Sequence, residues 1–249
     1  DFIHSLEGDG VRYVEVRFAP MQSVHPGLSC GQVLESVLEG LLQARRETGI
    51  DSRVIVCAMR HHPREKNLEM MRTARNYLGQ GVCALDLAGD EAAYPLKEFR
   101  QLFVEAKKLE FPFTIHAGEC QSLENVREAV ELGAARIGHG IALSKDPELM
   151  KTVGRLGIGL ELCPTSNFQT RAASPETYPL RKFLQARLAV SINTDNRTVS
   201  GTTLSKELEL AARLSGGLGD ERLFTENAVR TAFLSGEEKE ELLGKLEIS

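Results

Sequence analysis

The sequence has no apolar run that approaches the ~20 residues needed to span a bilayer, and its N-terminus has no hydrophobic segment of the signal-peptide type. It also has no basic tract, since 30 Lys and Arg stand against 35 Asp and Glu, for a formal net charge of −5. Nucleic acids and anionic membranes are therefore not expected as partners, because both require clustered positive charge. We expect a soluble, cytoplasmic protein.

Cysteine is sparse and scattered. The five cysteines are odd in number, lie far apart and form no Cys-x-x-Cys pair, which favours a reducing compartment and argues against a cysteine-ligated zinc. Cys163-Pro164 is not followed by the second cysteine of the P-C-x-x-C zinc deaminases. That class of enzyme is excluded.

The chain instead alternates strand-like apolar runs with helix-like segments. The strand-like runs are residues 11–18, 53–59, 82–87, 113–115, 136–137, 158–162 and 188–193. Helical periodicity is clearest over 29–49, where Ser29 and Gln32 have capping-box spacing, and a further helix is expected over 63–78. This alternation predicts parallel strands joined by right-handed crossovers.

Two architectures have this pattern. The doubly wound sandwich normally carries a Gly-rich phosphate loop after its first strand, and neither G-x-G-x-x-G nor G-x-x-x-x-G-K-[ST] occurs here. We therefore predict an α/β fold of the (β/α)8 TIM-barrel type, as one domain over residues 1–249. Seven strands are counted where eight are needed, and the chain opens on Asp1 with residues 2–7 patterned like the tail of a helix. We expect an N-terminally incomplete domain that lacks the first strand.

Three strand-like runs end in residues that bind metals or transfer protons. His116 is followed by Glu119, His139 ends the next run, and Asp195 follows the last. The C-terminal ends of barrel strands converge on one pocket, so we expect these side chains to lie together. His116 and Asp195 suit zinc, and a partly buried Glu119 with a raised pKa suits proton transfer. His4, His25, His61 and His62 are not assigned as ligands.

Simpler interpretations remain open for the same residues. Glu119 could cap the helix that starts near Ser122. His139 lies between two glycines and could be a solvent-exposed turn residue, and Asp195-Asn196 could form an ordinary Asx turn. The recurrence of such residues at three strand ends favours the chemical interpretation.

Seven motifs, in order along nearly the whole chain, resemble the adenosine deaminase family of metal-dependent amidohydrolase barrels. They are Val14-Glu15-Val16-Arg17 with Ala19-Pro20, Met59-Arg60-His61, Asp86-Leu87-Ala88-Gly89-Asp90-Glu91, His116-Ala117-Gly118-Glu119, Gly138-His139-Gly140, Leu162-Cys163-Pro164-Thr165-Ser166-Asn167 and Asn193-Thr194-Asp195.

The resemblance implies one Zn²⁺ and a purine nucleoside substrate. By this resemblance His116 and Asp195 ligate zinc, Glu119 protonates ring nitrogen N1, and His139 orients and supports the attacking hydroxide. It also implies that the N–H of Gly89 contacts ring N3 and that Asp86 lies on the ribose side.

The sequence departs from the family at two points. The family supplies two further zinc ligands from a His-x-His pair, which this sequence does not contain. The family often has Asp-Asp where this chain has Asp195-Asn196, and an Asn amide can donate a hydrogen bond to the purine N7 acceptor.

We therefore expect zinc-dependent hydrolytic deamination of adenosine and 2′-deoxyadenosine to the inosine products, with release of ammonia, as in purine salvage. One alternative is an adenine or adenine-nucleotide deaminase, for which Arg17, Arg60 and Arg171 are the candidate phosphate-side cations. The other is a catalytically incomplete nucleoside-binding barrel. No oligomeric state is predicted.

Overall fold

The computed structural model describes residues 1–246 and divides the chain into two compact units. The first unit comprises residues 1–90 and 98–113, and the second comprises residues 91–97 and those from 114 onward. Each unit is described by itself below. The single domain expected over residues 1–249 stays a prediction.

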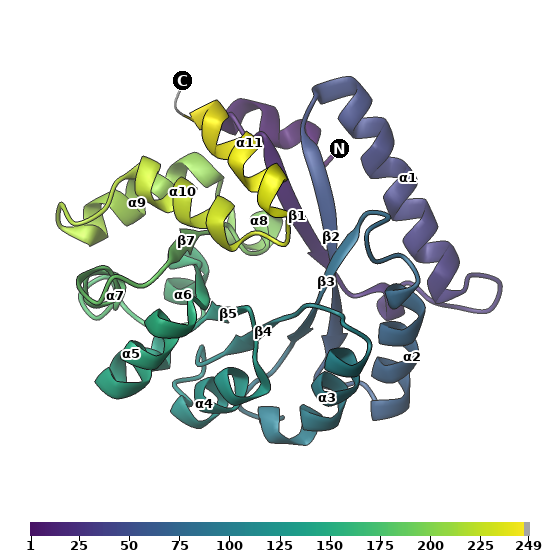
Figure 1. The fold of residues 1–249 in the computed structure, drawn as a ribbon, viewed down its shortest axis with the longest axis horizontal. Helices are drawn as coiled ribbons and strands as arrows, with labels where there is room; N and C mark the ends of the chain where they lie inside the picture. Colours follow the sequence, from purple (N-terminus) through teal and green to yellow (C-terminus); the bar gives the residue numbers. More distant parts are fainter. Residues whose placement is uncertain (247–249) are drawn as a thin grey trace. The chain divides into compact units, whose positions relative to one another are not determined.

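The first unit contains a three-stranded parallel sheet in the order β1-β2-β3 (Figure 1). Its strands are β1 (Tyr13–Phe18), β2 (Asp51–Met59) and β3 (Val82–Ala88). Its helices are α1 (Cys30–Thr48), α2 (Arg64–Arg75) and α3 (Arg100–Lys108), with 3-10 turns at His4–Asp9, Pro20–Gln22 and Leu96–Phe99. Helices α1 and α2 pack against β2, and α3 packs against α2.

Helix α1 begins and ends where the sequence predicts. The Ser29 hydroxyl accepts from the backbone N–H of Gln32, and the Gln32 side chain accepts from the N–H of Ser29, which completes the capping box. Gly49 ends the helix in the left-handed conformation at φ 75°, and its N–H donates to the carbonyl of Arg45.

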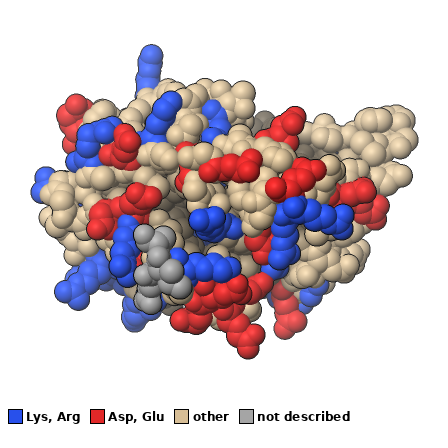
Figure 2. Space-filling model, turned by 90° about the horizontal axis from the view of Figure 1, so that it is seen from above, with Lys and Arg blue, Asp and Glu red and all other residues tan. Residues whose placement is uncertain are grey.

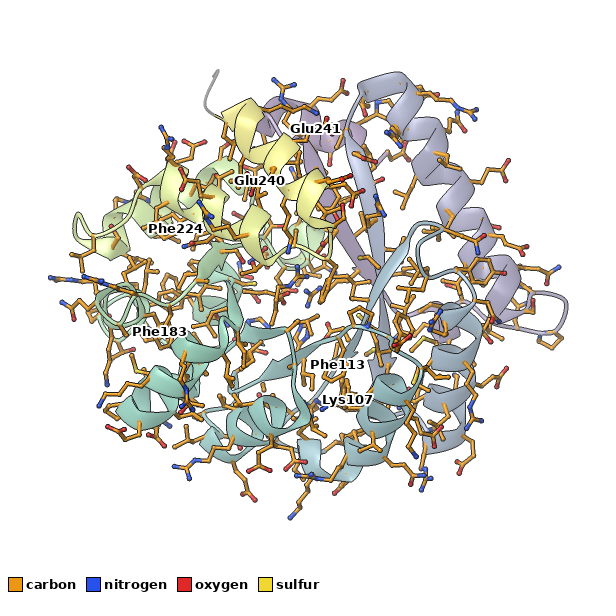
Figure 3. The ribbon with its side chains drawn as sticks, in the orientation of Figure 1. Lys107, Phe113, Phe183, Phe224, Glu240 and Glu241 are labelled. Carbon is orange, nitrogen blue, oxygen red and sulfur yellow. The ribbon has the colours of Figure 1, made fainter. Side chains whose placement is uncertain are left out.

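The core of the first unit surrounds the buried middle of β2 and β3. Phe103 of α3 stacks near Phe113, which Figure 3 labels, with ring centroids 4.8 Å apart. The backbone N–H of Leu85 donates to the carbonyl of Pro112, and so joins the segment after α3 to the edge of β3. Buried on both faces, these strands have the continuous apolar character that the sequence suggested.

The second unit contains a four-stranded parallel sheet in the order β4-β5-β6-β7 (Figure 1). The strands are β4 (Thr114–Ala117), β5 (Arg136–His139), β6 (Gly159–Leu162) and β7 (Val190–Ile192). Between them lie α4 (Leu123–Leu132), a 3-10 turn (Ile141–Lys145), α5 (Pro147–Leu156), α6 (Pro164–Gln169) and α7 (Leu180–Gln185). All seven expected strands are therefore present, with ends that differ by a few residues.

The sequence pattern predicts no helix or strand for residues 197–246, but the structure is helical there. The helices are α8 (Arg197–Ser200), α9 (Leu204–Ser215), α10 (Glu221–Thr231) and α11 (Gly236–Leu246), and Figure 3 labels Glu240 and Glu241 on the last. Helix α10 packs against β6 and β7, and the Asn227 amide donates to the carbonyl of Val190 at 3.1 Å. Phe183 of α7 and Phe224 of α10 are buried in this unit (Figure 3).

A buried ion pair joins β5 to β6. Arg136 donates from Nε to Glu161 at 2.6 Å and from Nη1 to the carbonyl of Thr231, and its guanidinium lies over the ring of Phe233. Glu161, a polar residue in an apolar strand, is thus matched by a structural partner.

None of the helices in the described part of the chain is long and apolar enough to cross a membrane.

Candidate active site

The strand ends of the second unit bring the two candidate histidines together. His116 is the third residue of β4 and His139 is the last residue of β5. In the register of the two strands His116 lies opposite Gly138, and Ala117 lies opposite His139. The two imidazole rings meet edge to face, with centroids 5.0 Å apart and planes inclined by 64°.

Gly138 makes this contact sterically feasible. A Cβ atom at this position would lie 3.2 Å from the Cα atom of His116 and 3.3 Å from Cγ and Nδ1 of its ring. These separations are tighter than ordinary van der Waals contact. The imidazole of His116 therefore occupies the space that a side chain on β5 would fill.

His139 is buried, with only 2% of its surface exposed, so the alternative of a solvent-exposed turn histidine is wrong. Its backbone has φ 61°, in the left-handed region that non-glycine residues rarely occupy. Nδ1 of its ring lies 3.0 Å from the amide nitrogen of Asn167. Nε2 lies 3.6 Å from a carboxylate oxygen of Glu119.

Glu119 faces the same cluster. Its Oε1 accepts from the Thr170 hydroxyl at 3.0 Å and lies 3.4 Å from the amide nitrogen of Asn167. Ser122 is the N-cap of α4, because its hydroxyl accepts from the N–H of Asn125, so the interpretation of Glu119 as that cap is wrong. The Glu119 side chain is 29% exposed and is thus open to both solvent and the cluster.

A buried acid holds the loop that carries Glu119. The Glu91 carboxylate accepts from the N–H of Gly118 at 2.5 Å, from the N–H of Cys120 at 3.1 Å and from the amide of Asn125 at 2.9 Å. Gly118 has φ 86°, and a Cβ there would lie 2.6 Å from a methyl carbon of Val126. The turn thus requires both the glycine and the carboxylate that braces its two N–H groups.

Asp195 follows β7 in a left-handed conformation at φ 53°. Its Oδ2 accepts from the Ser166 hydroxyl at 2.8 Å, which fixes the orientation of the carboxylate. Asn196 caps α8, since its Oδ1 accepts from the N–H of Val199 at 3.0 Å. Asn196 thus has a structural role as a helix cap, and its amide NH₂ is the end not used by the cap.

The donor types at these strand ends fit zinc, but their number does not complete a site. His116 offers an imidazole nitrogen and Asp195 a carboxylate oxygen, which are both zinc donors. Within residues 1–246, however, no three His, Cys, Asp or Glu residues are grouped so that they could hold a metal ion. A catalytic zinc normally keeps three protein ligands, so no reaction step is assigned to a metal here.

Two further candidate residues lie in the first unit. Asp86 of β3 is fully buried; its Oδ2 accepts from Arg17 at 2.9 Å and its Oδ1 from the N–H of Leu87 at 2.7 Å. Gly89 follows β3 at φ 112°, where a Cβ would lie 3.5 Å from the backbone N of Arg60. Their substrate contacts stay predictions.

The other histidines have local partners. The ring of His4 contacts Glu7 and Glu47, and the rings of His61 and His62 lie 4.6 Å apart. Burial, followed by the nearby charge of Lys66, lowers the pKa of His62.

The sequence profile of the family described as "Adenosine deaminase" matches residues 1–248. The chain belongs to the adenosine deaminase family. The adenosine deaminase of Enterococcus faecalis is 43% identical over 249 residues, covering 99% of this chain and 74% of that protein. One from Clostridium botulinum strain Loch Maree is 42% identical over 246 residues, covering 97% and 73%. The expected family and enzyme class are confirmed.

Solved structures confirm the fold class. An adenine deaminase from Arthrobacter aurescens superposes with a TM-score of 0.88 at 22% identity, covering 99% of this chain and 76% of that one. An N6-mAMP deaminase from Arabidopsis gives 0.86 at 23%, covering 99% and 76%. An amidohydrolase from Burkholderia ambifaria with bound Zn gives 0.87 at 24%, covering 96% and 68%.

The sequence motifs alone assign no function to several residues of this adenosine deaminase site. Glu91, Ser166 and Asn167 stand within the family motifs, whereas Thr170 and Tyr178 stand outside them. One signal was available, since Asn167 and Thr170 are three residues apart and so share a face of a helix. Both do reach Glu119, Asn167 from α6 and Thr170 from the C-cap of that helix.

Proposed function

We propose that the chain carries the hydrolytic deamination of adenosine and 2′-deoxyadenosine to inosine and 2′-deoxyinosine, with release of ammonia, in purine salvage. The observation that carries the proposal is the cluster of Glu119, His139 and Asn167 beside His116. It gathers an acid and two imidazoles at adjacent strand ends in a member of the adenosine deaminase family. The cytoplasmic location expected from the sequence stays a prediction.

In this proposal Glu119 and His139, which lie 3.6 Å apart, act together at the reacting end of the purine. Glu119, which faces both the cluster and solvent, takes a proton from the attacking water and delivers it to ring nitrogen N1. His139 holds the attacking oxygen from its buried position, and loss of ammonia completes the substitution. The N–H of Gly89 contacts ring N3, and Asp86 serves the ribose side.

Zinc is the proposed cofactor, with His116 and Asp195 as two of its ligands. When bound, zinc supplies an activated water at neutral pH. The Ser166 hydroxyl that orients Asp195 is the kind of outer partner that metal-ligating carboxylates use. Since the sequence contains no His-x-His, we expect the 249-residue chain to bind zinc weakly, as measured by titration calorimetry against the His116→Ala variant.

Asn196 is the proposed N7 contact. Because its Oδ1 accepts from the N–H of Val199, its amide NH₂ is the end left to donate to the purine acceptor. Asn196→Asp keeps the cap but replaces that donor with an acceptor. We expect KM for adenosine to rise about tenfold, with little change for 7-deazaadenosine, which lacks the acceptor.

The test of the proposed function is ammonia release from adenosine by the zinc-supplemented chain. Glu119→Gln should slow turnover by about 10²–10⁴-fold, the range of general acid catalysis, without loss of adenosine binding. The matched control is Glu148→Gln, the same change on a side chain of α5 that is 81% exposed. Near-normal turnover by Glu119→Gln would exclude it as the proton donor.

Two alternatives are resolved by the same assay. Adenosine binding without turnover in the parent chain would favour the catalytically incomplete nucleoside-binding barrel. Comparison of adenosine, adenine and AMP separates the nucleoside, base and nucleotide classes. We favour the nucleoside, because Arg17 is already bonded to Asp86 and Arg60 is only 1% exposed, so two of the three candidate phosphate-side cations are engaged or buried.

A further inference from the structure

Helix α6 and its C-cap residue Thr170 contact three of the candidate groups, which are Asp195, Glu119 and His139. Ser166 donates to Asp195, Thr170 donates to Glu119, and the Asn167 amide lies between Glu119 and His139. Ser166 and Asn167 belong to the Cys163-Pro164-Thr165-Ser166-Asn167 part of a sequence motif, and the proposed reaction assigns no chemical step to Asn167. Asn167 is completely buried, so its amide orientation is set by protein partners alone.

Two neighbours determine which way the Asn167 amide points. The Tyr178 hydroxyl donates to its Oδ1 at 3.2 Å. Tyr178 is buried, and burial raises the pKa of its phenol well above the usual range, so the hydroxyl keeps its proton and remains a donor. On the other side lies Glu119 Oε1, which accepts from the Thr170 hydroxyl and lies 3.4 Å from the amide nitrogen of Asn167, so the nitrogen end of the amide faces it.

The same amide nitrogen then fixes the proton on His139. It lies 3.0 Å from Nδ1 of the imidazole and has a second N–H to donate there. A neutral imidazole that accepts at Nδ1 must carry its proton at Nε2. That nitrogen is the one 3.6 Å from the Glu119 carboxylate.

We propose that Asn167, held by Tyr178, is a positioning residue that locks His139 in the Nε2–H tautomer. This inference rests on the proposed function for its catalytic meaning. In that tautomer the Nε2–H of His139 donates a hydrogen bond to the attacking oxygen. The ring therefore cannot serve as the base that removes a proton through this nitrogen, and proton delivery falls to Glu119.

The direct test is ¹⁵N NMR of the histidine rings in the unaltered 249-residue chain, at a pH above the last titration step of the His139 signals. The chain has six histidines, and the His139→Gln spectrum identifies the missing set of ring signals. We expect a pyridine-type ¹⁵N shift at Nδ1 and a pyrrole-type shift at Nε2. The reverse pattern, or an even mixture, would overturn the proposal.

Asn167→Asp tests the cause. An aspartate accepts from Nδ1–H and repels Glu119, so the tautomer should switch and kcat should fall at least ~10-fold, toward the ~10⁴-fold known for a histidine held in the wrong tautomer, with KM little changed. Asn67→Asp is the control for a buried charge in the first unit, where the Asn67 amide bonds the backbone of Met59. It should leave the His139 shifts unchanged.

A second variant covers the case in which Asn167→Asp does not fold. Tyr178→Phe removes only the hydroxyl that orients the amide, so the Nδ1–H form should become detectable beside the Nε2–H form. An unaltered tautomer in Tyr178→Phe and in a folded Asn167→Asp would contradict the positioning role. Because the NMR readout requires no turnover, an inactive chain with the expected shifts would refute the proposed function alone.

Discussion

The two units treat the acid at the end of a strand in opposite ways. In the first unit Asp86 is fully buried and paired with the Arg17 guanidinium at 2.9 Å. In the second unit Glu119 is partly exposed, and its partners are an amide, a hydroxyl and an imidazole. Within the described residues it has no Lys or Arg partner.

This difference distinguishes a carboxylate that stabilises the fold from one that, by our proposal, takes part in the reaction. A guanidinium favours the ionised carboxylate and so holds Asp86 in one state. The amide of Asn167 and the hydroxyl of Thr170 hold Glu119 in place without a guanidinium beside it. An acidic side chain near the end of a strand thus stabilises the fold in one unit and, by our proposal, takes part in the reaction in the other.

The largest expected effect comes from neutralising each acid in turn. Asp86→Asn leaves Arg17 without its carboxylate and should lower the free energy of unfolding by about 2–4 kcal/mol. This is near the low end of the loss expected when a buried ion pair is broken, because the Arg17 side chain is 28% exposed. Glu119→Gln should change it by less than about 1 kcal/mol. Urea unfolding of both variants checks this, and equal losses would remove the distinction between the two acids.

Glu91→Gln tests the support beneath Glu119. The amide end of Gln cannot accept, so one of the three donors now bonded to Glu91 loses its partner, at a cost of about 1–3 kcal/mol in stability. We also expect deaminase turnover to fall because the Glu119 loop shifts. Glu148→Gln is the control, and unchanged turnover at reduced stability would confine Glu91 to folding.

A smaller effect is expected from Gly138→Ala, which presses a methyl group against the backbone and ring of His116. We expect a loss of about 1–2 kcal/mol in unfolding free energy and a shift in the His116 ring signals. Gly154→Ala is the control, because its added Cβ would lie at a similar distance, 3.1 Å, from its nearest neighbour. That neighbour is only the end of the Leu188 side chain, and Gly154 lies in a helix, where alanine is more favourable than glycine. A neutral Gly138→Ala would show that the contact tolerates a side chain.

The smallest effect concerns a partly buried acid, Asp146, which caps α5. The N–H of Leu149, then the Arg127 side chain, lower the pKa of its carboxyl despite an opposing desolvation. Its stabilising effect is therefore complete above the ordinary Asp pKa and is lost as pH falls through the lowered value. Between pH 7 and about pH 3 the melting temperature of Asp146→Asn should fall less than that of the parent chain. An equal fall in both would contradict the assignment.

Local signals in the sequence predicted much of the fold. The capping box at Ser29 and the stop at Gly49 are each contained within a few residues, and both are present in the structure. The first six strand runs were found for the same reason. The last run, predicted over 188–193, is only Val190–Ile192, because the residues after it turn toward α8.

The site was predictable only where it coincides with strand ends. His116 and His139 follow from the parallel sheet, but the burial of His139 does not, since flanking glycines are equally typical of an exposed turn. Asn167 and Tyr178 act on His139 from 28 and 39 positions along the chain through the packing of α6 and the segment after it. Such contacts have no local pattern.

The left-handed backbone at His139 and Asp195 has a consequence for engineering. Each non-glycine residue in that region is held at roughly 1–2 kcal/mol above a relaxed conformation. Consensus design or laboratory evolution that rewards only heat resistance will drift toward glycine or asparagine at these two positions. Retaining both side chains under such selection therefore requires a simultaneous screen for turnover.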